Sequence, residues 1–308
     1  MDIFEEIDDI KYFKNSIVTI GVFDGLHLGH RKLLNKLVKV SKLCNTQSVV
    51  VTFNPHPREV LTTSFFNNCI TPIQTKINLF KELGIENVLI IPFDKEFSNV
   101  TARAFTEDII LNKFKPLEII LGSNHHFGKN RQGDIVYLNK IMSKHNVKVT
   151  GINQCEMSGE IISSTIIRKM IKKGDMESAR IMLSDKFSFN GTIVKGDGRG
   201  KTLNFPTANI KPCYINQLIP KKGVYSVNLV INGIIYKGMC NIGTRPTFNS
   251  SEKELIEVHV FNLDDVNLYN EKVKLIFNKY IRREKKFNSK ESLIEQLKID
   301  RQICQTID

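Results

Sequence analysis

The sequence lacks the features that mark secreted, zinc-binding and membrane-spanning proteins. Its six cysteines lie far apart, with no Cys-x-x-Cys pair and no histidine close enough to indicate a zinc site, so we interpret them as reduced thiols. No apolar run approaches the ~18 residues that a membrane span needs. The first ten residues carry five acidic and no basic side chains, the opposite of a secretory signal. We therefore expect a cytoplasmic protein with no membrane partner.

The sequence also has no internal repeat, no low-complexity linker and no block of lysine and arginine. Hydrophobic residues make up 41% and charged residues 25% of the 308 residues, which is typical of folded globular proteins. The 44 Lys and Arg residues exceed the 32 Asp and Glu residues by 12, and this charge favours anionic partners such as nucleotides. A basic RNA-binding protein is one alternative. Because neither a basic block nor an aromatic-rich RNA-recognition strand supports it, we expect no nucleic-acid partner.

The pattern of the first half predicts an α/β fold. At roughly 100 to 200 residues per domain, the length of the chain predicts two domains. Four apolar, strand-like runs at 17–23, 47–53, 87–93 and 117–121 alternate with segments of helical spacing. Such an alternation indicates a parallel sheet with helices on its faces.

The pattern changes after about residue 184. Strand-like runs follow one another until a helical pattern appears at 289–299, and Asn232-Gly233 between two runs is typical of a type I′ hairpin. This order predicts a separate antiparallel barrel or sandwich closed by one helix. We therefore predict a first domain at 1–184 and a second at 185–308. The predicted strands are 187–195, 223–231, 234–241, 254–261 and 271–277.

A turn rich in glycine and histidine follows the first predicted strand. It reads Asp24-Gly25-Leu26-His27-Leu28-Gly29-His30, and a helix begins at once. In open α/β sheets, ligands bind at the carboxyl ends of strands, where helix N-termini offer free N–H groups to phosphate. The two imidazoles would lie beside that phosphate. The alternative is an ordinary connection with two surface histidines.

Hydroxyl side chains begin another predicted helix. Ser163, Ser164 and Thr165 can cap this helix and contact phosphate, and Arg168, one turn later, offers several donors to a leaving pyrophosphate. The alternative is an ordinary capped helix.

A glycine-rich segment at 196–202 resembles a P-loop but is one residue too short, and an extended stretch closed by proline follows it instead of a helix. We reject a P-loop. The backbone N–H groups of the segment can still bind phosphate, with Lys201 nearby. Thr207 and Asn209, two residues apart, offer the hard oxygen ligands that suit Mg²⁺.

One predicted strand of the second half carries Glu257 and His259, which its alternation places on the same face. We expect the carboxylate of Glu257 to face inward. A general base for a hydroxyl nucleophile is one reason for such a group, and a salt bridge is the other.

Three segments of the first half resemble one enzyme family. Residues 21–30, 51–58 and 162–168 are similar to the adenylyltransferase half of the prokaryotic bifunctional riboflavin kinase/FAD synthetase. The resemblance implies a Rossmann-like nucleotidyltransferase domain that joins FMN to the AMP of ATP, with His27 and His30 as catalytic residues. It implies ATP and phosphate binding by Gly21, Phe23, Asp24, Gly25, His27, His30, Asn124, Ser163, Ser164, Thr165 and Arg168, and flavin binding by Asn54, Pro55, His56 and Pro57.

The first half departs from the family at His125 and His126, where phenylalanine and, commonly, arginine are usual. We favour loop histidines over a metal site, because adjacent side chains point in different directions in most backbones. We hypothesise that His126 replaces a basic phosphate contact, which would make FAD synthesis fall as the pH rises past ~6.5.

Segments of the second half at 191–210, 222–225, 241–248 and 257–259 resemble the riboflavin kinase module, a small Greek-key barrel. The resemblance implies that Glu257 accepts the proton of the ribityl 5′-hydroxyl, and that Thr207 and Asn209 hold Mg²⁺ and ATP. It implies ATP or flavin binding by Gly196, Lys201, Thr207, Asn209 and Arg282.

Together the resemblances predict a bifunctional enzyme. Its substrates and products would be ATP, riboflavin, FMN, FAD and pyrophosphate, with Mg²⁺ as cofactor. One alternative is a monofunctional FMN adenylyltransferase with a degenerate barrel, which Asn204 in place of a usual glycine keeps open. Another is a transferase for nicotinamide nucleotides or lipid precursors, which would lack the barrel.

Overall fold

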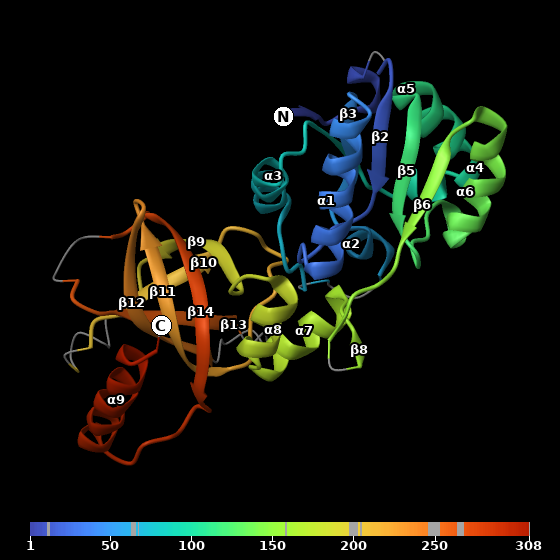
Figure 1. The fold of residues 1–308 in the computed structure, drawn as a ribbon. Coiled ribbons are helices and arrows are strands. Elements are labelled where there is room, and N and C mark those ends of the chain that lie inside the picture. Colours follow the sequence, from blue (N-terminus) through green and yellow to red (C-terminus); the bar gives the residue numbers. More distant parts are fainter. Residues whose placement is uncertain are drawn as a thin grey trace. The chain divides into compact units, whose positions relative to one another are not determined.

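The computed structural model describes residues 1–10, 13–62, 66, 68–157, 159–196, 203, 205–245, 253–263 and 268–307. The chain divides into two compact units, Met1–Ser164 and Thr165–Asp308 (Figure 1). All six cysteines lie in the described ranges and form no disulfide. Among the described helices, none has the length and apolar character needed to cross a membrane.

The first unit is built on a parallel sheet with the strand order β1-β4-β3-β2-β5-β6. From β2 the chain adds β3 and β4 on one side, and then β5 and β6 on the other. Ligands bind at such a reversal, outside the carboxyl ends of the strands, which here means β2 and β5. The strands are β1 (Asp2–Phe4), β2 (Ser16–Ile20), β3 (Gln47–Asn54), β4 (Asn87–Pro92), β5 (Pro116–Gly122) and β6 (Lys148–Ile152).

Helices cover both faces of this sheet, because successive side chains of each strand point to opposite faces. Ile17 and the apolar residues of neighbouring strands on the same face of the sheet pack with α1 (Leu28–Leu43) and α3 (Ile73–Glu82) in one apolar core. Val18 and its equivalents pack with the helical stretch 102–114 and with α6 in a second core. The other helical elements are α2 (Pro57–Leu61), α4 (Ala102–Ala104), a π-helix (Phe105–Leu111), α5 (Asn112–Phe114), α6 (Ile135–Met142) and the 3-10 turns Ile7–Asp9, Phe97–Asn99, Lys129–Arg131 and Ser143–His145.

The predicted parallel sheet is confirmed, with two differences. The first predicted strand, 17–23, ends at Ile20, because Phe23, Gly25 and Leu26 have φ values of 51°, 88° and 39° that turn the chain out of the sheet. Strands β1 and β6 were not predicted. A short hairpin, β7 (Glu156–Met157) and β8 (Glu160–Ile161), completes the unit.

The second unit is a closed antiparallel barrel with the order β10-β13-β12-β11-β14-β9. The connections from β10 to β11 and from β13 to β14 each pass over two strands, as in a Greek key. Tyr225, Phe187, Phe189 and Phe277 fill the interior with ring contacts of 5.3 to 6.3 Å between centroids. The strands are β9 (Ser188–Val194), β10 (Ala208–Pro212), β11 (Gly223–Ile231), β12 (Ile234–Arg245), β13 (Lys253–Val260) and β14 (Lys272–Arg282).

The barrel confirms the predicted type I′ hairpin, since Asn232 and Gly233, both with positive φ, join the paired residues Ile231 and Ile234. Strand β10 was not predicted, because its five residues end in proline and lack strict alternation. Except for its first residue, α7 (Ser164–Lys173) belongs to this unit, as does α8 (Met176–Leu183), which packs against β14.

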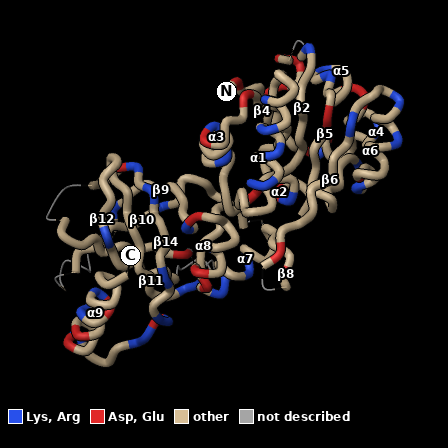
Figure 2. Tube along the Cα trace, in the orientation of Figure 1, with Lys and Arg blue, Asp and Glu red and all other residues tan. Residues whose placement is uncertain are grey.

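The C-terminal helix α9 (Lys290–Gln305) covers part of the outer face of the barrel (Figure 1). Lysine and arginine are spread along it and over the rest of the chain, interleaved with acidic residues (Figure 2). A buried ion pair anchors the helix. Asp300, with no exposed surface, accepts from Nε and Nη2 of Arg282 at 2.6 to 3.0 Å and from Nε2 of Gln296 at 3.0 Å.

We expect Asp300→Asn to lower the free energy of unfolding of the second unit by about 3–5 kcal/mol, because it leaves the Arg282 charge without its buried partner. Urea unfolding followed by circular dichroism measures this loss. The control is Glu177→Gln, which breaks an exposed ion pair with Arg180 (2.7 Å) and should cost at most about 1 kcal/mol. Equal losses in the two variants would contradict the anchoring role.

Candidate active sites

The turn between β2 and α1 is shaped by an aromatic ring that folds back on its own backbone. Phe23, 2% exposed, packs edge-on against His30 (5.3 Å) and Phe80 (5.7 Å). A Cβ on Gly21 would lie 2.9 Å from this ring, so only glycine fits there. The predicted residues Gly21, Phe23 and Gly25 therefore form the turn itself.

The two predicted catalytic histidines lie together at the start of α1. The rings of His27 and His30 are stacked with centroids 3.7 Å apart and planes at 20°. The ring of His27 lies over Gly29, where a Cβ would be 3.3 Å from it. His27 is the N-cap residue, yet no side chain caps the helix, and its first turn has no acidic residue. The N–H groups and the positive end of the helix dipole are therefore suited to an anion.

Both imidazoles are held neutral. Burial lowers the pKa of His27 to about 4, against a smaller opposing effect of Asp24. Burial, and then the neighbouring His27, Lys76 and His125, lower the pKa of His30 well below 6.5. The Nδ1 atoms of His27 and His30 are buried and have no hydrogen-bond partner among the described residues. They are thus unsatisfied polar groups beside the uncapped start of α1.

Lys76 is a cation at this site that the sequence analysis missed. It is 4% exposed, its Nζ donates to the carbonyl of Val22 at 3.0 Å, and burial lowers its pKa, whereas Asp24 raises it. The signal in the sequence was its position on the apolar face of α3, between Ile73 and Phe80 at helical spacing.

The carboxylate of Asp24 holds the turn in place. Its carboxylate, 2% exposed, accepts from the backbone N–H groups of Ile70 (3.0 Å) and Thr71 (2.9 Å). Ser164 Oγ donates to the carbonyl of Asp24 at 2.8 Å. The structure therefore brings the predicted Ser164 to the histidine turn. Ser163 lies in the same unit, whereas Thr165 and Arg168 belong to the second one.

The predicted flavin residues lie at the end of β3, the strand beside β2, and directly after it. The Asn54–Pro55 peptide bond is cis, and Pro57 begins α2. His56, 9% exposed, caps α2 by accepting from the N–H of Arg58 at 3.0 Å, and its ring stacks on Phe66 at 4.8 Å. Because β2 and β3 are parallel neighbours, this loop lies at the same edge of the sheet as the histidine turn.

The loop after β5 borders the histidine turn on its other side. Asn124 and His126 are exposed, whereas His125 is half-buried and stacks on Phe127 at 6.1 Å. Burial, and then His126 and Arg131, lower the pKa of His125 to about 4. Of the two histidines that depart from the family pattern, it is therefore His125 that lowers the pKa of His30. Within the described residues, no group of three or more His, Cys, Asp and Glu side chains is arranged to hold a metal ion.

In the barrel, Glu257 faces outward, so the expectation of an inward carboxylate is wrong. Its neighbour Val258, with no exposed surface, points into the barrel, and strand alternation sends Glu257 to the other face. There it lies directly between Asn209 on β10 and Asn241 on β12. Asn209 is 8% exposed, and its amide packs so closely on Gly196 that a side chain there would collide with it.

The remaining predicted residues of the barrel differ in what the structure shows. Thr207 is exposed and lies just before β10, two residues from Asn209. Lys201 lies outside the described residues. The guanidinium of Arg282 is bound by Asp300, and its Nη1 also donates to the carbonyl of Arg283 at 2.9 Å.

These two sites define an enzyme that combines a nucleotidyltransferase-type α/β unit with a phosphate-handling barrel. The family model of FAD synthetase matches residues 9–166, and that of riboflavin kinase matches residues 183–307. The chain belongs to the family of bifunctional riboflavin kinases/FMN adenylyltransferases.

Curated relatives with that name cover almost the whole chain. The relative from Buchnera aphidicola subsp. Schizaphis graminum is 39% identical over 95% of this chain and 94% of its own. Those from Escherichia coli K12 and Bacillus subtilis 168 are 33% and 32% identical, over 92% and 93% of this chain and 90% of theirs. These names favour two activities over a monofunctional transferase or an RNA-binding protein.

A crystal structure from Streptococcus pneumoniae, described as a macrolide-efflux protein, has a TM-score of 0.89 to this chain. It is 28% identical and covers 99% of this chain and 98% of its own. Its description differs from the names of the sequence relatives, although the fold is shared over the full length.

We expect the stability of the first unit to fall as the pH drops from 6.5 towards 4. In this range the unfolded chain binds protons at histidines whose folded pKa is about 4. The stability contributed by neutral His27 and His125 is therefore complete above pH 6.5 and is lost progressively as the pH falls to about 4. The loss should be on the order of 2 kcal/mol per histidine. Urea unfolding at pH 7.5, 6 and 5 measures it.

The variant His125→Phe keeps a ring against Phe127 and should flatten part of this pH dependence. The control is His145→Gln, which removes an exposed imidazole. If His125→Phe and the wild-type chain lost stability equally between pH 7.5 and 5, the burial of a neutral His125 would be contradicted.

Proposed function

We propose that the unit Met1–Ser164 carries the adenylyl transfer to FMN and that the barrel carries the phosphorylation of riboflavin. As a member of its family the chain is a riboflavin kinase and FMN adenylyltransferase, with ATP, riboflavin, FMN and FAD as substrates and products. The observation that carries the assignment is the stacked pair His27 and His30 at an uncapped helix start, where the strand order reverses.

In adenylyl transfer, an oxygen of the FMN phosphate attacks the α-phosphorus of ATP, and pyrophosphate leaves with the electrons of the broken P–O bond. The attacking phosphate is already an anion, so the protein must position the reactants and neutralise charge. The N–H groups at the start of α1 and the neutral rings of His27 and His30 donate hydrogen bonds to the phosphates. Lys76 adds a positive charge behind the turn.

The loop Asn54, Pro55, His56 and Pro57 forms the proposed flavin side of this site. Support comes from its position after β3, next to the histidine turn, and from the flat stack of His56 on Phe66, which suits a planar ring. Asn124, Ser163 and Ser164 complete the proposed phosphate side. Contacts of Thr165 and Arg168 with the same phosphates stay a prediction.

In the kinase reaction, the ribityl 5′-hydroxyl attacks the γ-phosphorus of ATP, Glu257 takes its proton, and ADP leaves. A positioned base contributes ~10²- to 10⁴-fold to the rate. The hydroxyl of Thr207 and the amide oxygen of Asn209 are suited to hold Mg²⁺, which when bound neutralises phosphate charge. Gly196 leaves room for the Asn209 amide. The role of Lys201 stays a prediction.

For Arg282, the bidentate pair with Asp300 favours a role in anchoring α9, and its contact with a substrate stays a prediction. So does a functional boundary at 184/185, since the compact units divide at Ser164 and the family models leave 167–182 unmatched. A cytoplasmic location, where ATP is abundant, and the absence of nucleic-acid and membrane partners also stay predictions.

We expect Glu257→Ala to lower FMN formation from riboflavin by about 10²- to 10⁴-fold and to leave FAD formation from supplied FMN unchanged, because it removes only the kinase base. His27→Ala should do the reverse. Each variant is incubated with ATP, Mg²⁺ and either riboflavin or FMN, and the flavins are separated by chromatography.

Each variant thus serves as the control for the other. Loss of both activities in a variant whose circular dichroism matches the wild type would contradict two separate sites. FAD formation without any FMN formation in the wild-type chain would instead support the monofunctional alternative.

A further inference from the structure

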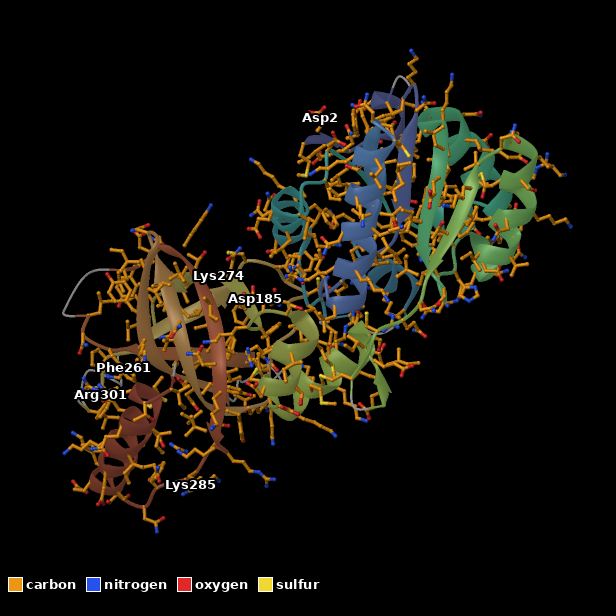
Figure 3. All side chains as sticks on the ribbon, in the orientation of Figure 1. Asp2, Asp185, Phe261, Lys274, Lys285 and Arg301 are labelled. Carbon is orange, nitrogen blue, oxygen red and sulfur yellow. The ribbon has the colours of Figure 1, made fainter. Side chains whose placement is uncertain are left out.

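A buried histidine on the strand of Glu257 has no role in the reactions above. His259 lies two residues after Glu257 on β13 and therefore on the same outer face. It is 6% exposed, and its ring packs edge-on against Phe205 at 5.0 Å and Phe261 at 5.6 Å. Phe261 is in turn covered by the guanidinium of Arg301 from α9 at 5.5 Å, and the two lie next to each other in Figure 3.

The ring of His259 makes one directed contact with the segment that carries Thr207. Its Nδ1 lies 2.8 Å from the carbonyl oxygen of Pro206. A carbonyl only accepts, so Nδ1 must carry the proton and donate it. The other nitrogen, Nε2, is buried without a partner among the described residues, so charging it would be unfavourable. His259 is thus fixed as a neutral donor aimed at the residue before Thr207.

The hydrogen bond between His259 and Pro206 lies just beyond the end of the pairing between β10 and β13. Among the described residues, strands β10 and β13 pair at Ala208 with Val258 and at Asn209 with Glu257. Pro206 has no N–H group and cannot extend the pairing. Thr207 precedes the first paired residue of β10 with β13 (Ala208) and with β9 (Asn209), so neither pairing fixes its backbone, although its hydroxyl must keep a fixed distance from Glu257 for phosphoryl transfer.

We propose that His259 is a positioning residue for riboflavin phosphorylation, which holds the Pro206 carbonyl and thereby fixes Thr207 relative to Glu257. This inference rests on the proposed roles of Thr207 and Glu257. A purely structural residue would affect folding. A substitution of His259 should instead change the binding of the ATP phosphates, and it should do so through Thr207.

The first test is His259→Phe, which keeps a ring between Phe205 and Phe261 but removes the donor. We expect the KM for ATP in riboflavin phosphorylation to rise by about 10- to 100-fold, the range typical of residues that orient a ligand-binding group. His259→Asn, whose amide nitrogen can occupy the position of Nδ1, should recover most of the loss. FAD formation from supplied FMN, measured in the same preparations, should stay within twofold of the wild type.

The matched control is Met239→Leu. Met239 lies directly opposite His259 on β12 and is 5% exposed, but it makes no such hydrogen bond. This variant perturbs the same packing and should leave the KM for ATP unchanged. If His259→Phe does not fold, as judged by circular dichroism and FAD formation, His259→Gln provides a smaller variant whose donor sits at the position of Nε2 instead; the same rise in KM is expected from it.

A double-mutant cycle with Thr207→Val completes the test. If His259 acts through Thr207, its removal should add less than twofold to the KM for ATP once the hydroxyl is gone. Three outcomes would overturn the inference and leave the kinase assignment intact. They are an unchanged KM in both His259→Phe and His259→Gln, equal effects in His259→Asn and His259→Phe, and full additivity with Thr207→Val. A wild-type chain that forms no FMN from riboflavin would overturn both.

Discussion

The architecture of the transferase site depends on one buried carboxylate. Asp24 binds two backbone N–H groups ahead of α3, and its own carbonyl receives the hydroxyl of Ser164, so three segments distant in sequence meet at one residue. With the turn held there, Phe23 folds over Gly21 and the rings of His27 and His30 stack at the start of α1. The carboxylate of Asp24 therefore shapes the turn, and its predicted contact with ATP stays a prediction.

The two proposed sites differ in the groups that they offer to phosphate chemistry. In the first, burial keeps the imidazoles uncharged, so in the proposed site the N–H groups and the dipole of α1 would act on the phosphates together with the cation Lys76. In the barrel, Glu257 lies between two amides on neighbouring strands, and its proposed role is to accept the proton of the attacking hydroxyl. The proposal thus combines a transferase site without a general base and a kinase site with one.

Much of this was predictable from the sequence, because periodicity records burial. The alternation of strands and helices gave the parallel sheet, and Asn232-Gly233 gave the hairpin. Features that depend on long-range packing were not predictable: the outward direction of Glu257 depends on which strand face the barrel encloses, and β10 forms only because β9 and β13 flank it. Lys76 on α3 and Asp300 on α9, the partner of Arg282, were missed because a charged side chain on a helix is ordinarily solvated.

The strand order of the first unit also bears on how safely the chain folds. In the part of the chain that the structure describes, the barrel is closed, so the edge strands of the two large sheets are β1 and β6. An exposed edge strand can pair with strands of other molecules and lead to aggregation. Here β1 has only three residues and starts with Asp2, while β6 starts with Lys148 and contains Gly151. Short or charged edge strands of this kind discourage pairing between molecules.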